Sequence, residues 1–140
     1  MKMTKDDVKK ILPHREPMLL VDEITVDEEG TAHGLYRVRG DEFFLQGHFP
    51  GNPVVPGVIL CEIMAQACGL LIGDEIKGKT PVYTGLDKVR FRNSVRPGDE
   101  IRVTARIERR MGNFFFAAAE AHVGDKLCVQ GKLSFALLEG

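Results

Sequence analysis

Residues 47–69 read Gly-His-Phe-Pro-Gly-Asn-Pro-Val-Val-Pro-Gly-Val-Ile-Leu-Cys-Glu-Ile-Met-Ala-Gln-Ala-Cys-Gly, and this stretch decides the fold. Proline fixes the backbone angle φ and glycine permits conformations closed to other residues, so the first half predicts a rigid loop around His48. The second half predicts a helix that begins near Pro56, because proline is well tolerated in a first helical turn. This helix is apolar on nearly all sides, which is typical of a buried helix.

Two polar side chains interrupt the apolar helix. Glu62 and Gln66 are four residues apart and therefore share one face. A rigid loop that carries a histidine, followed by a buried helix that carries a carboxylate, predicts an acid–base site. Taken singly, each residue also has a structural explanation, since His48 can satisfy loop carbonyls and Glu62 can pair with an arginine.

The composition is that of one globular domain spanning residues 1–140. Hydrophobic residues make up 44% and charged residues 28%, and the net charge of −1 gives no general attraction to nucleic acid or membrane. Three cysteines without a C-x-x-C pair favour free thiols over a disulfide framework or a zinc site. The polar N-terminus does not resemble a signal peptide, and no apolar run is expected to reach a membrane-spanning length. We therefore expect a cytoplasmic protein.

The rest of the chain predicts mainly strands. Thr4 is expected to cap a short helix, and His14, in the connector that follows, is expected to be a surface histidine. Apolar content or alternation between turns predicts strands over residues 18–26, 31–39, 82–91, 101–107, 114–123 and 127–138. Residues 117–121 are rich in alanine and locally ambiguous, but the flanking turns favour a strand. Because only a sheet can cover the long apolar helix, we expect an α+β fold with one antiparallel sheet of about six strands wrapped around it.

Motifs along essentially the whole chain resemble those of one family. They are Leu12-Pro13-His14-Arg15, Leu20-Val21-Asp22, the run from Gly47 to Val58, Glu62-x-x-Ala65-Gln66, Asp87-Lys88-Val89-Arg90-Phe91-Arg92 and Val95-x-Pro97-Gly98-Asp99. Together they resemble the FabZ-type beta-hydroxyacyl-[acyl-carrier-protein] dehydratases of fatty-acid synthesis. The resemblance implies a hot-dog fold, dehydration of a (3R)-3-hydroxyacyl thioester to a trans-2-enoyl thioester, and neither a cofactor nor a metal.

Such a dehydration has three chemical tasks, and residues 47–69 offer a group for each. His48 can take the C2 proton, because the ordinary pKa of a histidine, about 6.5, leaves it largely neutral at cytosolic pH. The backbone N–H of Gly57 can polarise the thioester carbonyl at the start of the helix. Glu62, among apolar neighbours that disfavour its charged form, can protonate the leaving hydroxyl or position the departing water, with Gln66 orienting it. The sequence leaves open the reverse assignment of His48 and Glu62, or a shared water.

The resemblance also implies partners. His48 of one subunit is expected to meet Glu62 of another across a dimer interface, and three such dimers often form a hexamer. The expected macromolecular partner is an acyl carrier protein with a phosphopantetheine-linked acyl chain. Lys88, Arg90 and Arg92 alternate along one predicted strand and either dock this acidic carrier or form an ordinary solvated face. Neither nucleic acid nor a membrane is an expected partner.

Three other functions compete with this hypothesis. A hot-dog thioesterase would hydrolyse the thioester with a carboxylate-activated water and would not need the histidine loop. A dehydratase that also isomerises the double bond is expected, from the resemblance, to carry aspartate in place of Glu62. A non-catalytic acyl-binding subunit would have no use for His48, Gly57, Glu62 and Gln66 together.

Overall fold

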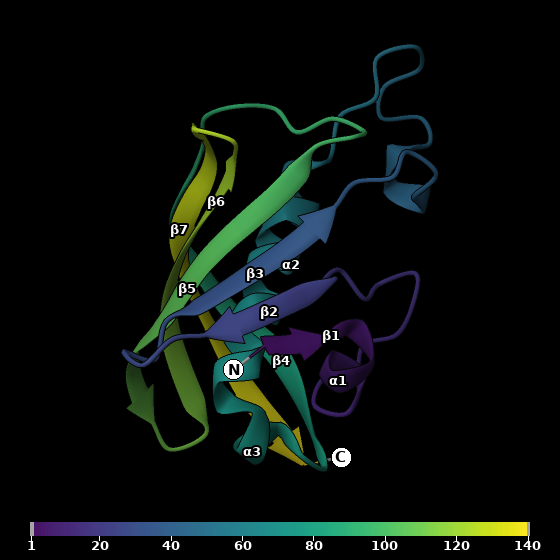
Figure 1. The fold of residues 1–140 in the computed structure, drawn as a ribbon. Helices are drawn as coiled ribbons and strands as arrows, with labels where there is room; N and C mark the ends of the chain where they lie inside the picture. The colour runs from purple at the N-terminus through teal and green to yellow at the C-terminus, as the bar shows by residue number, and fades with distance from the viewer. Residues whose placement is uncertain (1, 140) are drawn as a thin grey trace.

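The computed structural model describes residues 2–139 and consists of one sheet curled around a central helix (Figure 1). Within residues 2–139 the sheet has seven strands, in the spatial order β1 (Lys2–Thr4), β2 (Glu23–Val26), β3 (Ala32–Arg37), β5 (Glu100–Met111), β6 (Phe114–Val123), β7 (Lys126–Glu139) and β4 (Lys79–Phe91). The helices are α1 (Lys5–Lys9), α2 (Gly57–Gly69) and α3 (Gly73–Ile76), with 3-10 turns η1 (Phe43–Leu45) and η2 (Leu70–Ile72). Every neighbouring strand pair is antiparallel, which confirms the expected α+β fold.

The core lies between α2 and the strands that contact it, β3, β5, β6 and β7. Leu60, Ile63 and Met64 of the helix are each at most 3% exposed. Full burial of one such side chain contributes about 1.5–3 kcal/mol, so this helix is a main source of the stability of the fold. A strand comes close to the helix backbone where Gly34 faces Ala67, and a Cβ built on Gly34 would lie 3.5 Å from the Cβ of Ala67.

The expectation that no apolar run reaches a membrane-spanning length is wrong for the helical segment Gly57–Ile76. It is 20 residues long with a mean hydropathy of 1.5, so by length and composition it is able to cross a membrane. More than half of it, 56%, is buried inside the protein. Since the sheet covers this segment, its apolar character is explained by its place as the core helix.

The N-terminal region follows the sequence prediction only in part. The helix expected after Thr4 is α1, and Thr4 and Asp7 form a reciprocal capping box at its start. The strand expected over residues 18–26 is confined to β2. Leu20 is buried, but its backbone N–H donates to the side chain of Gln66 rather than to a neighbouring strand. The short strand β1 was not expected and brings the sheet to seven strands.

Strand β4 forms one edge of the sheet, with β7 as its only neighbour among the described strands. Large apolar side chains along this edge are exposed: Tyr83 by 42%, Leu86 by 50% and Phe91 by 55%. A long edge strand with exposed apolar side chains is a template for pairing with another chain. The loop with His48 projects beyond the end of the sheet, on the path from β3 to α2 (Figure 1).

Candidate active site

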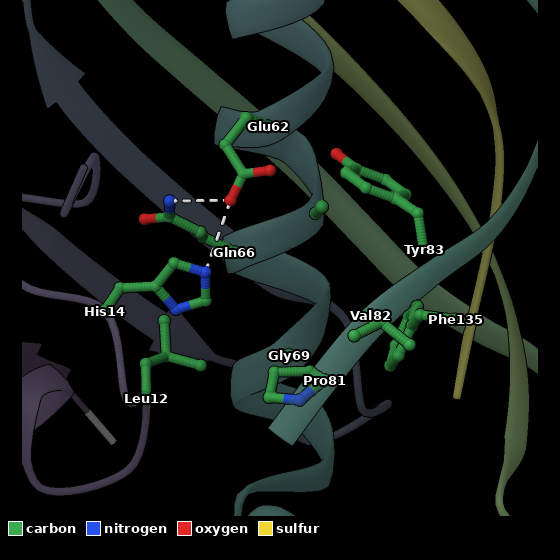
Figure 2. A pocket seen from close by; sticks show the side chains of 10 residues that line it. Leu12, His14, Glu62, Gln66, Gly69, Pro81, Val82, Tyr83 and Phe135 are labelled. Carbon is green, nitrogen blue, oxygen red and sulfur yellow. Dashed lines mark hydrogen bonds and ion pairs between the residues drawn. The ribbon is translucent and has the colours of Figure 1, made fainter. Parts of the chain in front are cut away.

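Glu62 projects from α2 into a small cavity, and its side chain is 19% exposed (Figure 2). Its Oε2 accepts a hydrogen bond from Nε2 of Gln66 at 2.9 Å. The two side chains meet because a separation of four residues places them one helical turn apart. The sequence predicted this contact correctly.

Gln66 also joins the helix to the connector that precedes β2. The side chain is 1% exposed, and its Nε2 donates to the backbone carbonyl of Met18 at 2.8 Å as well as to Glu62. Its Oε1 accepts from the backbone N–H of Leu20 at 2.8 Å. Both N–H groups of the buried amide therefore have partners, as does its oxygen, which avoids a cost of about 1–3 kcal/mol for each buried polar group left unpaired.

His14 belongs to the same cluster, and the expectation that it is a surface histidine is wrong. Its Nε2 lies 3.3 Å from Oε2 of Glu62, and its side chain is 23% exposed. Its Nδ1 is buried and has no hydrogen-bond partner among the described residues. The two residues are far apart in the chain and share no periodic pattern, so only the place of His14 in the Leu12–Arg15 motif hinted at a role.

Tyr83, from β4, lies across the cavity from His14 (Figure 2). Its hydroxyl donates to the backbone carbonyl of Cys61 at 3.0 Å. Burial, followed by the charge of Glu62, raises the pKa of Tyr83 well above its usual range, so the hydroxyl stays protonated at neutral pH. Tyr83 is therefore suited to donate a hydrogen bond and not to act as a base.

His48 is held by its own loop. Its Nδ1 lies 3.0 Å from the backbone oxygen of Val54, and the N–H of Val54 donates to the carbonyl of His48 at 2.9 Å. Because a carbonyl only accepts hydrogen bonds, Nδ1 carries a proton, and Nε2 of the neutral ring keeps a free lone pair. The His48–Phe49 peptide bond is cis, and the two rings stack 4.3 Å apart. Nε2 is therefore the ring atom of His48 that can accept a proton, and the role of His48 as a base stays a prediction.

Gly57 is the first residue of α2, so its N–H is one of the amides that the helix itself leaves free. The ring of Phe91 lies directly above it: a Cβ built on Gly57 would come within 2.7 Å of Cε1 of Phe91. Only glycine fits at this position without moving the ring. His48, Gly57 and Phe91 line one cavity together.

The site residues expected from the sequence thus fall into two groups. The cavity that contains Glu62 and Gln66, here called the Glu62 cavity, has a volume of about 70 Å³. The cavity that contains His48 and Gly57, here called the His48 cavity, is open and has a volume of about 510 Å³. Among residues 2–139, neither a hydrogen bond nor an ion pair joins His48 to Glu62. Since ligand sites usually measure about 300–1,000 Å³, the Glu62 cavity of a single chain is too small to hold an acyl thioester.

The basic residues Lys88 and Arg90 of β4, and Arg92 directly after it, do not share one regular face. The pairing with β7 shifts register between Asp87 and Arg90, and Lys88 has a φ of +53°. A bulge of this kind adds a residue to one strand and breaks the two-residue alternation that the sequence suggested. Lys88 borders a separate hollow, whereas Arg92 borders the His48 cavity.

Cysteines and metal ligands add nothing to the site. Cys61, Cys68 and Cys128 are free and buried, as expected. Burial raises the pKa of the Cys68 thiol to about 12, so it is inert as a nucleophile at neutral pH. Among residues 2–139, no three His, Cys, Asp or Glu side chains are grouped to hold a metal ion.

Solved structures with the same architecture define the class. The dehydratase heterocomplex ApeI:P from Xenorhabdus doucetiae aligns with a TM-score of 0.78 and 24% identity over 92% of this chain and 89% of that chain. The fluoroacetyl-CoA thioesterase FlK aligns with a TM-score of 0.68 and 17% identity over 78% of this chain and 85% of that chain. At such identities the likeness shows the fold alone, a hot-dog fold shared by dehydratases and thioesterases.

Sequence comparison places the chain within that class. Residues 12–132 match the FabA-like domain family. The 3-hydroxyacyl-[acyl-carrier-protein] dehydratase FabZ of Clostridioides difficile is 45% identical over 137 residues, which cover 96% of each chain. The FabZ of Caldicellulosiruptor saccharolyticus is 47% identical over 133 residues, 93% of this chain and 95% of the relative. The chain therefore belongs to the FabA-like family, in its FabZ-type branch.

Proposed function

We propose that this protein is a hydro-lyase that converts (3R)-3-hydroxyacyl-[acyl-carrier-protein] to trans-2-enoyl-[acyl-carrier-protein] in the elongation cycle of fatty-acid synthesis. The observation that carries the proposal is a histidine whose Nε2 is free to act as a base, in a chain whose core helix carries a shielded carboxyl. Elimination of water needs only proton transfers, so acid–base groups suffice. The FabZ relatives are 3-hydroxyacyl-[acyl-carrier-protein] dehydratases, which is the same reaction class.

The proposed reaction is one elimination of water with two proton transfers. Nε2 of His48 takes the proton from C2, and the electrons of that C–H bond form the C2–C3 double bond. The C3–O bond breaks as Glu62 gives a proton to the hydroxyl, which leaves as water. His48 ends protonated and Glu62 ionised, so a proton returns from the histidine to the carboxylate before the next turnover. General acid–base groups of this kind typically contribute about 10²–10⁴-fold each, and we expect losses of that size for His48→Ala and Glu62→Gln.

The N–H of Gly57 supports the step in which charge develops on the thioester oxygen. It lies at the helix start and lines the same cavity as His48, so one bound thioester can reach both groups. A backbone donor at a helix N-terminus is oriented before the reaction and favours negative charge. In this proposal Gln66 touches no substrate and orients Glu62.

We further propose that each working site is shared by two chains. His48 and Glu62 lie in separate cavities, and the β4 edge with its exposed apolar side chains offers a surface for a second copy. Pairing at that edge would complete each Glu62 cavity with the partner's histidine loop. We expect light scattering to report the mass of a dimer or, as the resemblance implies, that of a hexamer made of three dimers.

Mixing two inactive variants tests the shared site. His48→Ala and Glu62→Ala proteins are each inactive, but after subunit exchange a mixed dimer contains one intact site and regains activity. The control is each variant mixed with itself under the same exchange conditions. Absence of recovery in a mixture shown by mass spectrometry to contain mixed dimers would exclude a site shared between chains.

We propose that an acyl carrier protein, in the cytoplasm, delivers the substrate to the exposed basic residues Lys88, Arg90 and Arg92. Arg92 is best placed for the phosphopantetheine phosphate, because it borders the His48 cavity. Charge reversal at Arg90 and Arg92 should raise KM for carrier-bound substrate and leave turnover of a short N-acetylcysteamine thioester unchanged. An equal effect on both substrates would rule out docking by these residues.

Product analysis separates dehydration from thioester hydrolysis, which other proteins of this fold perform. Purified protein is given a 3-hydroxyacyl thioester, and the enoyl thioester is followed by its absorbance and by mass. We expect a loss of one water and no free thiol. Release of free thiol without enoyl product would identify a thioesterase, and absence of any turnover would favour a binding subunit.

A further inference from the structure

The two carboxyl oxygens of Glu62 have unlike surroundings. Oε2 faces two nitrogen atoms, Nε2 of Gln66 at 2.9 Å and Nε2 of His14 at 3.3 Å. In Figure 2, Oε1 lies on the other side of the carboxyl group, away from both nitrogens and toward Tyr83. The Tyr83 hydroxyl donates to the carbonyl of Cys61 and also lies beside the Glu62 carboxyl. The two oxygens are therefore not interchangeable.

The two nitrogens next to Oε2, the Gln66 donor and the nearby Nε2 of His14, bear on where Glu62 carries a proton. A carboxyl oxygen has two lone pairs, and on Oε2 both are used when Gln66 and His14 donate to it. Oε2 can accept these bonds both as a carboxylate oxygen, where they are stronger, and as the carbonyl oxygen of the neutral acid. Any proton on Glu62 is then carried by Oε1, the oxygen directed into the cavity.

The surroundings of His14 favour the ring state that this arrangement needs. Its Nε2 faces an oxygen that already accepts from Gln66, and its buried Nδ1 has no partner among the described residues. A proton on Nδ1 would create a buried N–H without an acceptor, which is costly, whereas a neutral ring protonated on Nε2 satisfies the contact. The ionisable side chains that line the cavity are His14, Glu62 and Tyr83. His48 has the opposite tautomer, with its proton on Nδ1.

The backbone around His14 is fixed on both sides. The guanidinium of Arg15 donates from Nη1 to the carbonyls of Leu12 at 3.0 Å and His14 at 2.7 Å. Gln66 holds the connector further along, through Met18 and Leu20. The imidazole is thus placed before substrate arrives, which limits the reorganisation needed during the reaction.

We propose that His14 is a positioning residue for the dehydration. By donating from Nε2 to Oε2 of Glu62, together with Gln66, it reserves Oε1 as the oxygen that gives its proton to the leaving hydroxyl. His14 itself neither takes nor gives a proton in the reaction. The proposal rests on the proposed function and assigns the acid role to one atom of Glu62.

Two substitutions at one position test the proposal. His14→Gln keeps an N–H donor near the position of the imidazole Nε2, and His14→Leu removes the donor while leaving no new polar atom. We expect His14→Leu to lower kcat by about 10- to 100-fold with KM changed less than about threefold, because a misplaced catalytic group costs about 10²-fold. His14→Gln should stay within about threefold of wild type, with an unchanged pH profile of kcat. His33→Gln is the matched control, since that histidine also contacts a carboxylate, Asp27, at 3.0 Å on the hairpin after β2.

Three results would overturn the proposal. One is a wild-type kcat for His14→Leu. Another is a folded His14→Gln protein as impaired as His14→Leu, which would mean that the titrating ring itself transfers a proton. The third comes from NMR of wild-type protein labelled in its four histidine rings, with His14→Gln used for assignment. We expect the Nε2–H tautomer for His14, and an Nδ1–H tautomer would refute the contact even if the variants do not fold. If wild-type protein forms no enoyl product, the proposed function fails. The NMR measurement of the His14 tautomer is independent of that result and still tests the contact between His14 and Glu62.

Discussion

Replacing Gln66 by leucine tests how far the site and the fold depend on one buried amide. The substitution removes the donor to Glu62 and the donor to the carbonyl of Met18, and it leaves the backbone N–H of Leu20 without an acceptor. Leu20 is 1% exposed, so water cannot replace the lost partner. Each unsatisfied buried group costs about 1–3 kcal/mol, and the added apolar surface recovers about 1 kcal/mol. We expect Gln66→Leu to lower the free energy of unfolding by about 3 kcal/mol.

The measurement is urea unfolding, followed by circular dichroism at one protein concentration, because association contributes to the stability of an oligomer. Gln46→Leu is the matched control: Gln46 is exposed, and surface substitutions usually change stability by less than about 0.5 kcal/mol. The turnover of Gln66→Leu should fall as well, because Glu62 loses one of its two donors. If Gln66→Leu were as stable as Gln46→Leu, the three hydrogen bonds of Gln66 would not be what holds residues 18–20 against α2.

Gly57→Ala would put a Cβ 2.7 Å from Cε1 of Phe91, whose ring is exposed and has to move aside, so we expect a loss of stability of about 1–3 kcal/mol and a partial loss of activity. Adding Phe91→Ala should restore the lost stability in a double-mutant cycle, and additive effects would contradict the contact. Burial alone would raise the pKa of Glu42, but hydrogen bonds from backbone N–H groups and from the Tyr36 hydroxyl hold that pKa below its usual range. The ionised Glu42 therefore contributes stability that is present above about pH 4.5 and is lost as the pH falls. The free energy of unfolding of Glu42→Gln should fall less steeply on acidification than that of wild type, and parallel curves for the two proteins would contradict this role of Glu42. Burial raises the pKa of Cys68 from 9.0 to about 12, so the unfolded chain loses this proton first and stability declines as the pH rises from about 9 to 12. Native Cys68 should resist iodoacetamide at pH 8 and react once urea unfolds the chain; mass spectrometry of the labelled peptide reports both.

Strong local periodicity explains which elements could be predicted from the sequence. The apolar run after Pro56 is specific for a buried helix, and the two-residue alternation from β4 to β7 is specific for strands. The contact of Glu62 with Gln66 also follows from local geometry, since helix spacing alone places them together. The helix cap at Thr4 could be predicted for the same reason, since a cap is a local feature.

The parts that could not be predicted depend on contacts between distant segments. The run from Leu19 to Val21 is as apolar as a strand, but a helix side chain satisfies its backbone, and periodicity does not distinguish the two cases. His14 reaches Glu62 because Arg15 and Gln66 hold the connector around it in place. The bulge at Lys88 is a mismatch between two strands, which neither strand encodes alone.

The hydrogen bonds of Gln66 have a consequence for protein engineering. A transplant of residues 47–69 into another hot-dog scaffold would carry His48, Gly57, Glu62 and Gln66, yet Gln66 would meet a foreign backbone in place of residues 18–20. The donor from residue 14 would be missing as well. The smallest portable unit is therefore a pair of segments, 12–20 and 47–69, and a graft of the second without the first should give a folded helix whose carboxyl keeps only Gln66, itself no longer anchored to the backbone of residues 18–20.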